Sequence, residues 1–180
     1  SRILARQSHI KTDLFGDELS ELSPIVRADG SVSAMFDNAL EFLTMTGRSL
    51  THAAMMMIPQ PWEKDAQMDK DLRAFYEFHS HLMDPWDGPA GMVLTNGIQV
   101  AAVLDRNGLR PARYIETRDG RLILASETGT LPVEPENILY KERLRPGRML
   151  LIDTAEGRVI KDEELKMTVA QRHPYAHWID

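Results

Sequence analysis

Apolar residues recur at helical spacing through the first half of the chain. A helix is predicted to begin at Ser31 or Ser33, either of which can cap it, and to end near Gly47. Its apolar stripe consists of Phe36, Ala39, Leu40 and Leu43. Two more helices are predicted over residues 50–57 and 69–83, and a proline follows each of them closely.

From Gly88 onward the pattern changes to short apolar runs separated by turn dipeptides. Strands are predicted at 91–95, 98–104, 113–117, 122–126, 149–153 and 158–160. The dipeptides between neighbouring runs are typical of antiparallel hairpins: Asn96-Gly97, Asn107-Gly108, Asp119-Gly120 and Glu156-Gly157. We expect a Pro- and Glu-rich loop after residue 126, and a short helix with an exit segment over 161–180.

Helices followed by antiparallel strands indicate an α+β fold. The helical part covers residues 1–84 and the strands cover 88–160. No segment in the sequence obviously covers the second face of a five- or six-stranded sheet, so the sequence leaves open whether these residues close a core alone.

Composition narrows the class of protein. A hydrophobic content of 43% with 27% charged residues is typical of a globular domain, and a net charge of −6 argues against a general nucleic-acid surface. The chain has no cysteine, which excludes disulfides, thiolate metal sites and a cysteine nucleophile within these residues. The apolar runs are too short to span a bilayer and no signal peptide is visible, so we expect a cytoplasmic protein without membrane contacts. A first residue of Ser rather than Met suggests a fragment or a processed start.

A histidine pair and a methionine-rich region could suggest binding sites, but the pattern of each favours core packing. His79 and His81 are two positions apart, so on a helix they point in different directions and cannot easily share a metal ion. His79 is on the apolar stripe and is interpreted as a packed histidine, and no metal site is expected. Met45 and residues 55–57 form a methionine-rich region, which we expect to fill the core.

Several polar residues are weaker candidates for a site. Ser126 and Glu127 follow a predicted strand, and an amino-terminal Ser1 could in principle act as a nucleophile. Arg106, Arg110 and Arg113 flank a predicted turn, where they could bind a carboxylate or phosphate. The alternative interpretation, which we favour, is that these arginines pair with nearby acids to hold a hairpin. None of these residues is assigned a catalytic role.

Sequence motifs in both halves resemble class II glutamine amidotransferases. The runs DRNGLRPARY (105–114), ASETG (125–129) and RLRPGRMLLID (143–153) are typical of the class as a whole. More specific runs resemble the glutamate synthase large subunit: DLFGDELSELSPIV (13–26), SAMFDNALEFL (33–43), GRSLTHAAMMMIPQPW (47–62) and MDPWDGPA (83–90). The likeness extends over essentially all 180 residues.

The resemblance implies an N-terminal-nucleophile fold, in which helical layers enclose two antiparallel sheets (αββα). Residues 1–170 would be the C-terminal portion of the amidotransferase domain and 171–180 an exit segment towards the next domain. In the family, the catalytic cysteine is the first residue of the mature domain, an Asn-Gly pair forms the oxyanion hole, and an arginine holds the substrate carboxylate. Those elements would lie upstream of this chain, and Asn107-Gly108 belongs to a different motif.

One substrate contact of the family should fall within the chain. The family has Ser-Asp-Ser before Ala-x-Phe-Asp-Asn, and that aspartate accepts the ammonium of glutamine. Here the stretch is Ser31-Val32-Ser33, with Val32 at the place of the aspartate. A substrate ammonium facing valine loses hydration without gaining an ion pair. We therefore expect a degenerate glutaminase site, or a site whose ligand is not glutamine.

Two functional hypotheses follow. The first is a segment of the glutaminase domain of a glutamate synthase, which converts glutamine and 2-oxoglutarate to two glutamates and is inactive without the upstream residues. Its partners would be glutamine, the remaining synthase domains or a chain carrying the N-terminal half, and its FMN and iron–sulfur cluster would be in other domains. The second is a non-catalytic assembly or regulatory module of the same fold. A relative of amidophosphoribosyltransferases is disfavoured by GRSLTHAAMMMIPQPW.

Overall fold

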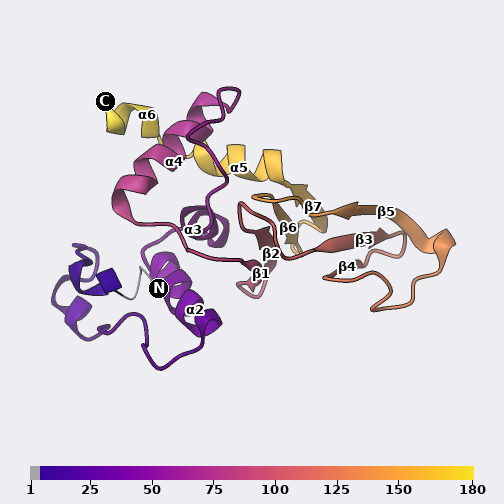
Figure 1. Ribbon diagram of the computed structural model, residues 1–180, viewed down its shortest axis with the longest axis horizontal. Helices are drawn as coiled ribbons and strands as arrows, with labels where there is room; N and C mark the ends of the chain where they lie inside the picture. The colour runs from indigo at the N-terminus through magenta and orange to yellow at the C-terminus, as the bar shows by residue number, and fades with distance from the viewer. Residues whose placement is uncertain (1–4) are drawn as a thin grey trace. The chain divides into compact units, whose positions relative to one another are not determined.

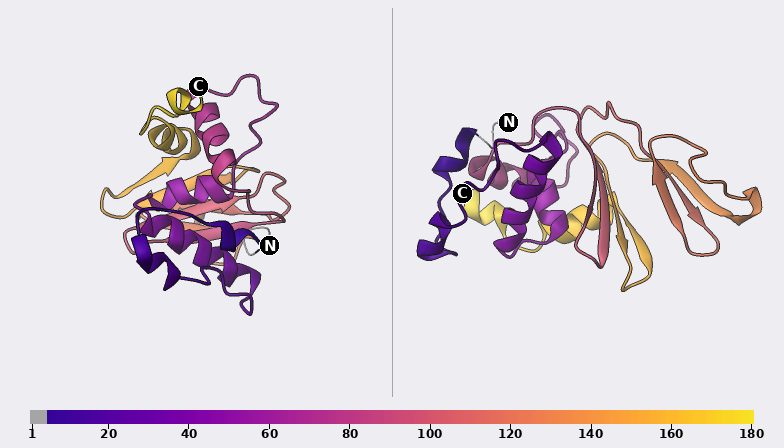
Figure 2. Two further views of the ribbon diagram at one scale, coloured as in Figure 1. Left: turned by 90° about the vertical axis from the view of Figure 1, so that its left-hand side faces the viewer. Right: turned by 90° about the horizontal axis from the view of Figure 1, so that it is seen from below.

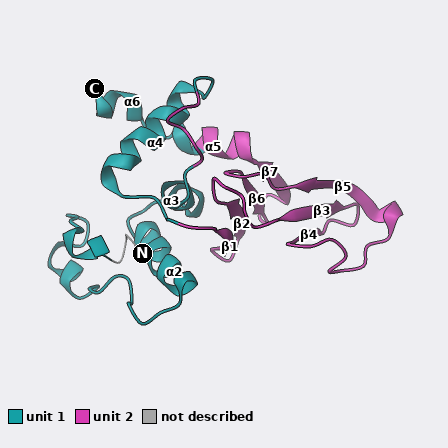
Figure 3. Cartoon of the chain, viewed as in Figure 1, with its two compact units in different colours: residues 1–59, 66–87, 169–180 teal, residues 60–65, 88–168 magenta. Residues whose placement is uncertain are grey.

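A computed structural model describes residues 5–180 of the chain. The chain divides into two compact units (Figure 3). The helical unit comprises Ser1–Pro59, Ala66–Asp87 and Val169–Asp180, and the sheet unit comprises Gln60–Asp65 and Gly88–Thr168. Both units are therefore assembled from segments that are distant in the sequence.

Among the described residues, the helical unit contains α-helices and short 3-10 helices (Figure 1). The α-helices are α2 (Val32–Met45), α3 (Leu50–Met57), α4 (Lys70–Leu82) and α6 (Tyr175–Ile179), and the 3-10 helices are η1 (Gln7–His9) and η2 (Gly16–Ser20). Side-chain caps fix three starts, because Ser31, Ser49 and Asp69 accept hydrogen bonds from backbone N–H groups in the first turns of α2, α3 and α4. The three predicted helices are confirmed, with Ser31 rather than Ser33 as the cap of α2.

Aromatic and methionine side chains fill the core of the helical unit. Every residue of α3 is buried, including all three methionines of its last turn, which confirms their predicted core role. The edge of one ring meets the face of another where Phe36 contacts Trp86 and where Phe75 contacts Tyr175. Met45 is a correction: its side chain is 51% exposed because it lies at the last turn of α2 on the face away from the core.

Seven strands in two antiparallel sheets form the sheet unit (Figure 2). The strands are β1 (Gly91–Thr95), β2 (Gln99–Leu104), β3 (Arg113–Thr117), β4 (Leu122–Ala125), β5 (Ile138–Arg143), β6 (Met149–Asp153) and β7 (Arg158–Lys161). Their orders are β1-β2-β6-β7 and β4-β3-β5. A further 3-10 helix, η3 (Pro135–Asn137), precedes β5, and α5 (Asp162–Ala170) follows β7.

Two sequence predictions about the sheets are wrong. The segment between residues 126 and 149 is not only a loop, because it contains β5, which pairs with β3. Asn107-Gly108 does not join a hairpin, because β2 and β3 belong to different sheets. The dipeptide instead turns the chain from one sheet to the other. The other three dipeptides do join antiparallel neighbours.

The two sheets share an apolar core, which explains how the strands are stabilised. Its buried members come from both sheets and their connections: Ala102, Leu104, Ala112, Tyr114, Leu144 and Leu150. Tyr114 adds a polar link, since its hydroxyl donates to Glu142 on β5 at 2.7 Å. The molecule is thus of mixed α+β class with antiparallel sheets. None of the helices within residues 5–180 combines the length and the apolarity needed to cross a bilayer.

Candidate functional site

The position that sequence analysis linked to the substrate ammonium lies at the start of α2. The Ser31 hydroxyl accepts a hydrogen bond from the N–H of Ala34 at 3.1 Å, and Val32 is the first residue of the helix with 64% of its surface exposed. No acidic residue lies in this first turn. The positive end of the helix dipole is therefore uncompensated by charge here, which is unfavourable for a cation. The roles assigned to Ser31 and Val32 in substrate binding stay predictions.

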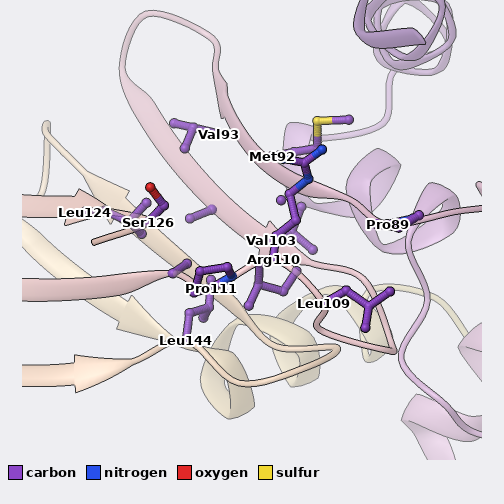
Figure 4. A pocket seen from close by; sticks show the side chains of 14 residues that line it. Pro89, Met92, Val93, Val103, Leu109, Arg110, Pro111, Leu124, Ser126 and Leu144 are labelled. Carbon is purple, nitrogen blue, oxygen red and sulfur yellow. The ribbon is translucent and has the colours of Figure 1, made fainter. Parts of the chain in front are cut away.

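A cavity of about 560 Å³ lies within the sheet unit (Figure 4). Leu124 and Ser126 lie on one side of it, and Pro89 and Leu109 on the other. Most of its walls are apolar and come from β1, β2 and the connection to β3. It brings together Arg110 and Ser126, two residues singled out separately in the sequence.

The lining of this cavity limits the chemistry that it supports. Among the described residues around it, Arg110 is the one charged side chain, and no histidine, lysine or carboxylate is present. Proton transfer to or from a bound molecule needs a group that titrates near neutral pH, which an arginine does not provide. The described lining residues therefore supply no group that could activate Ser126 by acid–base chemistry.

The arginines around the Asn107-Gly108 turn do not form the ion pairs that the favoured interpretation required. Within residues 5–180, Arg106, Arg110 and Arg113 make no salt bridge, and that interpretation is wrong. All three are exposed to solvent. Since the turn joins two sheets, no hairpin is present for them to clamp.

The DRNG motif is organised by its aspartate. Asp105 is 5% exposed, and one carboxylate oxygen accepts from the N–H groups of Asn107 and Gly108 at 2.9 and 3.2 Å. Its other oxygen accepts from the N–H of Ala90 at 3.1 Å, just before β1. These bonds satisfy a buried carboxylate and fix the turn between the sheets. Because the N–H groups of the Asn-Gly pair are occupied in this way, they are not free to stabilise an oxyanion.

His79 is a packed core residue, as predicted, but it has a partner that sequence analysis missed. Its Nε2 lies 2.9 Å from Nε2 of His52 on α3, and its Nδ1 lies 2.7 Å from the carbonyl oxygen of Phe75. A carbonyl only accepts, so Nδ1 of His79 carries the proton; with both rings neutral, His52 donates to His79. The two rings form a fixed pair inside the aromatic core.

Burial keeps this histidine pair uncharged. It lowers the pKa of His52 to about 3, with further contributions from His79 and Arg48. It also lowers the pKa of His79 to about 4, although the bond to Phe75 acts in the opposite direction. Across residues 5–180, no group of three or more His, Asp or Glu side chains is placed to hold a metal ion. Ser1 lies outside the described residues.

A second buried polar group, equally unforeseen, lies in the sheet unit. The Nζ of Lys166 on α5 donates to Asp162 at 2.8 Å, to the Gly147 carbonyl at 2.7 Å and to Gln60 at 2.5 Å. Lys166 is only 2% exposed, and burial lowers its pKa while Asp162 acts to raise it. The bonds to Gly147 and Gln60 join α5 to segments 19 and 106 residues away in the sequence. A lone lysine on an amphipathic helix gives no signal of such a role.

Comparison with known proteins gives matches over nearly the whole chain. The family model "Glutamine amidotransferases class-II" matches residues 1–178. The NADPH glutamate synthase large chain of Bacillus subtilis is 53% identical over 176 residues, which cover 98% of this chain and 12% of that protein. The NADH glutamate synthase of Schizosaccharomyces pombe is 46% identical over 177 residues, 98% of this chain and 8% of that protein.

A third relative differs from these two in its named electron donor, which is ferredoxin. The ferredoxin-dependent glutamate synthase of Pyropia yezoensis is 40% identical over 173 residues, which cover 95% of this chain and 11% of that protein. The chain thus spans about a tenth of the length of these curated relatives. The family match, the antiparallel sheets and the motifs agree. The chain belongs to the class II glutamine amidotransferase family, whose fold is that of the N-terminal-nucleophile hydrolases.

Proposed function

We propose that these residues are the C-terminal part of the glutaminase domain of a glutamate synthase. The observation that carries the proposal is the 53% identity to a glutamate synthase large chain over nearly the whole chain. In the proposed parent, glutamine is hydrolysed and the ammonia reacts with 2-oxoglutarate. The iron–sulfur cluster of the parent would be held by other domains, since the 180 residues contain no cysteine to ligate iron. We assign FMN to other domains as well. We place the parent in the cytoplasm.

On this proposal, the 180 residues expressed alone do not hydrolyse glutamine. The family nucleophile is a cysteine with a free α-amine, and no cysteine is present in the chain. The remaining synthase domains, or a chain carrying the N-terminal half, would supply it. Release of ammonia from glutamine by the isolated chain would contradict the proposal.

A chimera tests the role of the segment directly. The N-terminal part of the Bacillus subtilis glutaminase domain would be fused ahead of residue 1, and glutaminase activity measured with a coupled ammonia assay. We expect weak activity with Val32 and a KM for glutamine at least about tenfold lower after Val32→Asp, since a charged hydrogen bond contributes about 1.5 to 3 kcal/mol. The matched control is Val32→Asn, which has a similar shape without the charge.

The same experiment separates the second candidate function, a non-catalytic module. Val32 at the ammonium position is the observation that favours it. If the chimera is folded by circular dichroism but inactive even with Val32→Asp, the segment is a module and the glutaminase proposal is wrong. If Val32→Asp and Val32→Asn change the KM equally, the site assignment fails and the domain assignment stands.

A further inference from the structure

A second cavity, of about 500 Å³, lies entirely within the helical unit. Residues of α2, α3 and α4 and of the segment before α2 contribute to its walls. Its apolar surface comes mainly from Ile25, Ala39, Phe42, Leu43, Met56 and Met83. A volume of this size is within the range of small-molecule sites in proteins, roughly 300 to 1,000 Å³.

The polar groups of this cavity carry an excess of positive charge. Arg6, Lys11 and Arg48 line it, with Asp84 as the one carboxylate among the described lining residues. Asp84 already pairs with Arg6 at 2.6 Å. Lys11 and Arg48 form no salt bridge with any residue from 5 to 180.

Arg48 is half-buried between Thr46 and the start of α3, whereas Arg6 and Lys11 are exposed. Its Nη1 donates to the Thr46 hydroxyl, and its other N–H donors have no partner among residues 5–180. The charge also acts on the nearby core, where it helps to lower the pKa of His52 and of His79. A half-buried guanidinium next to apolar walls is stabilised when an anion pairs with it.

We propose that this cavity binds a small organic anion, with its anionic group on Arg48 and its apolar body against Phe42, Leu43 and Met56. Lys11 adds attraction at the exposed rim, where salt screens it more strongly. Arginine suits this role because its planar fork matches a carboxylate, sulfonate or phosphate with two parallel hydrogen bonds. The apolar walls select a ligand with a hydrocarbon or aromatic part over an inorganic anion. The proposal is independent of glutamine hydrolysis.

A pair of matched fluorescent probes tests the proposal on the 180-residue chain. The anionic probe is 8-anilinonaphthalene-1-sulfonate, and the neutral probe is N-phenyl-1-naphthylamine, which has the same aromatic body without the sulfonate. We expect the anionic probe to bind with one-to-one stoichiometry, and Arg48→Met to weaken it about tenfold, or about 1.4 kcal/mol. Arg48→Lys should retain most of the affinity, and the neutral probe should not respond to either change.

Arg106→Met is the control for a general loss of charge, because Arg106 is exposed in the sheet unit. It should leave binding of both probes unchanged. Equal binding of the anionic probe to the chain and to Arg48→Met would overturn the proposal, as would a stoichiometry well above one. If Arg48→Met does not fold by circular dichroism, the unaltered chain still decides: the Nε–H signal of Arg48 in NMR spectra must shift on titration with the anionic probe and not with the neutral one.

Discussion

The helical unit buries a pair of neutral histidines, whereas the sheet unit buries a charged lysine with a carboxylate partner. In the helical unit, His52 and His79 are neutral rings that bond to each other among aromatic side chains. In the sheet unit, the Lys166 ammonium is paired with Asp162 and bonded to two further oxygens. A buried neutral pair needs one partner for each polar atom, whereas a buried cation needs a carboxylate and several acceptors. The difference predicts different responses to mutation and to pH.

Substitution of Lys166 should lower the free energy of unfolding more than any other change considered below. Lys166→Met removes one of the two ion pairs of Asp162, which keeps Arg148, and leaves Gln60 and Gly147 with unused acceptors. We expect the free energy of unfolding in urea to fall by about 4 kcal/mol, since an unpaired buried acceptor costs about 1 to 3 kcal/mol and an ion pair is lost as well. Lys141→Met on the exposed face of β5 should change it by less than about 0.5 kcal/mol.

A double change checks the cause of that loss. Gln60→Met in the Lys166→Met background removes one of the unpaired acceptors and should recover part of the stability. If the double variant is less stable than Lys166→Met alone, the unpaired acceptor is not the origin of the effect.

The second largest effect is expected from lowering the pH, which should destabilise the folded chain through the pair of His52 and His79. The folded pKa values of about 3 and about 4 lie below the usual 6.5, so the unfolded chain binds more protons between these values. The contribution of the pair is fully present above pH 6.5 and is lost as the pH falls towards 4. From pH 7.5 to 5.5 we expect a loss of about 3 kcal/mol from the two histidines, measured by urea unfolding.

The control for acid sensitivity is the double variant His52→Gln with His79→Gln, in which the pH dependence should be shallower by up to two protons. His177→Gln, at an exposed position of α6, should not change the slope. In NMR spectra of the unaltered chain, the imidazole signals of His52 and His79 should stay at their neutral positions at pH 5.5. Protonation of either ring near pH 6.5 would contradict the pairing.

The smallest expected effect compares two glycines within the sheet unit. Gly108 and Gly120 both have positive φ, at +58° and +83°, but a Cβ at Gly108 would lie 2.3 Å from Cγ of Pro146 and one at Gly120 would meet nothing within 4 Å. Gly120→Ala should cost about 1 kcal/mol through backbone strain alone. Gly108→Ala should cost about 2 to 3 kcal/mol by thermal unfolding, since overpacking adds to the strain. Equal costs would mean that Pro146 moves aside.

The sequence revealed features that depend on neighbouring residues and missed those that depend on distant ones. The helix start at Ser31 and the hairpins at Asn96-Gly97 and Asp119-Gly120 are local, and the structure confirms them. β5 was missed because its residues are mostly exposed and show little alternation of apolar and polar side chains. Its identity as a strand comes from pairing with β3.

The candidate sites show the same limit. His79 could be placed in the core from its helical stripe, but His52 is 27 residues away and no spacing rule links the two. Arg110 and Ser126 were singled out separately, and the cavity between them becomes visible only when the strands are assembled. The Asn107-Gly108 dipeptide alone does not predict a turn between sheets, which depends on the bonds of Asp105 to the turn and to Ala90.

The short segment Gln60–Asp65 has a practical consequence for anyone dividing this protein. It belongs to the sheet unit, where Gln60 accepts from Lys166, although helical-unit residues precede and follow it along the chain. In return, Tyr175 near the C-terminus contacts Phe75 of α4. Cutting the gene once, for instance after codon 87, would leave each product without a strand of chain that completes its interior. Neither product would contain all the segments of its unit.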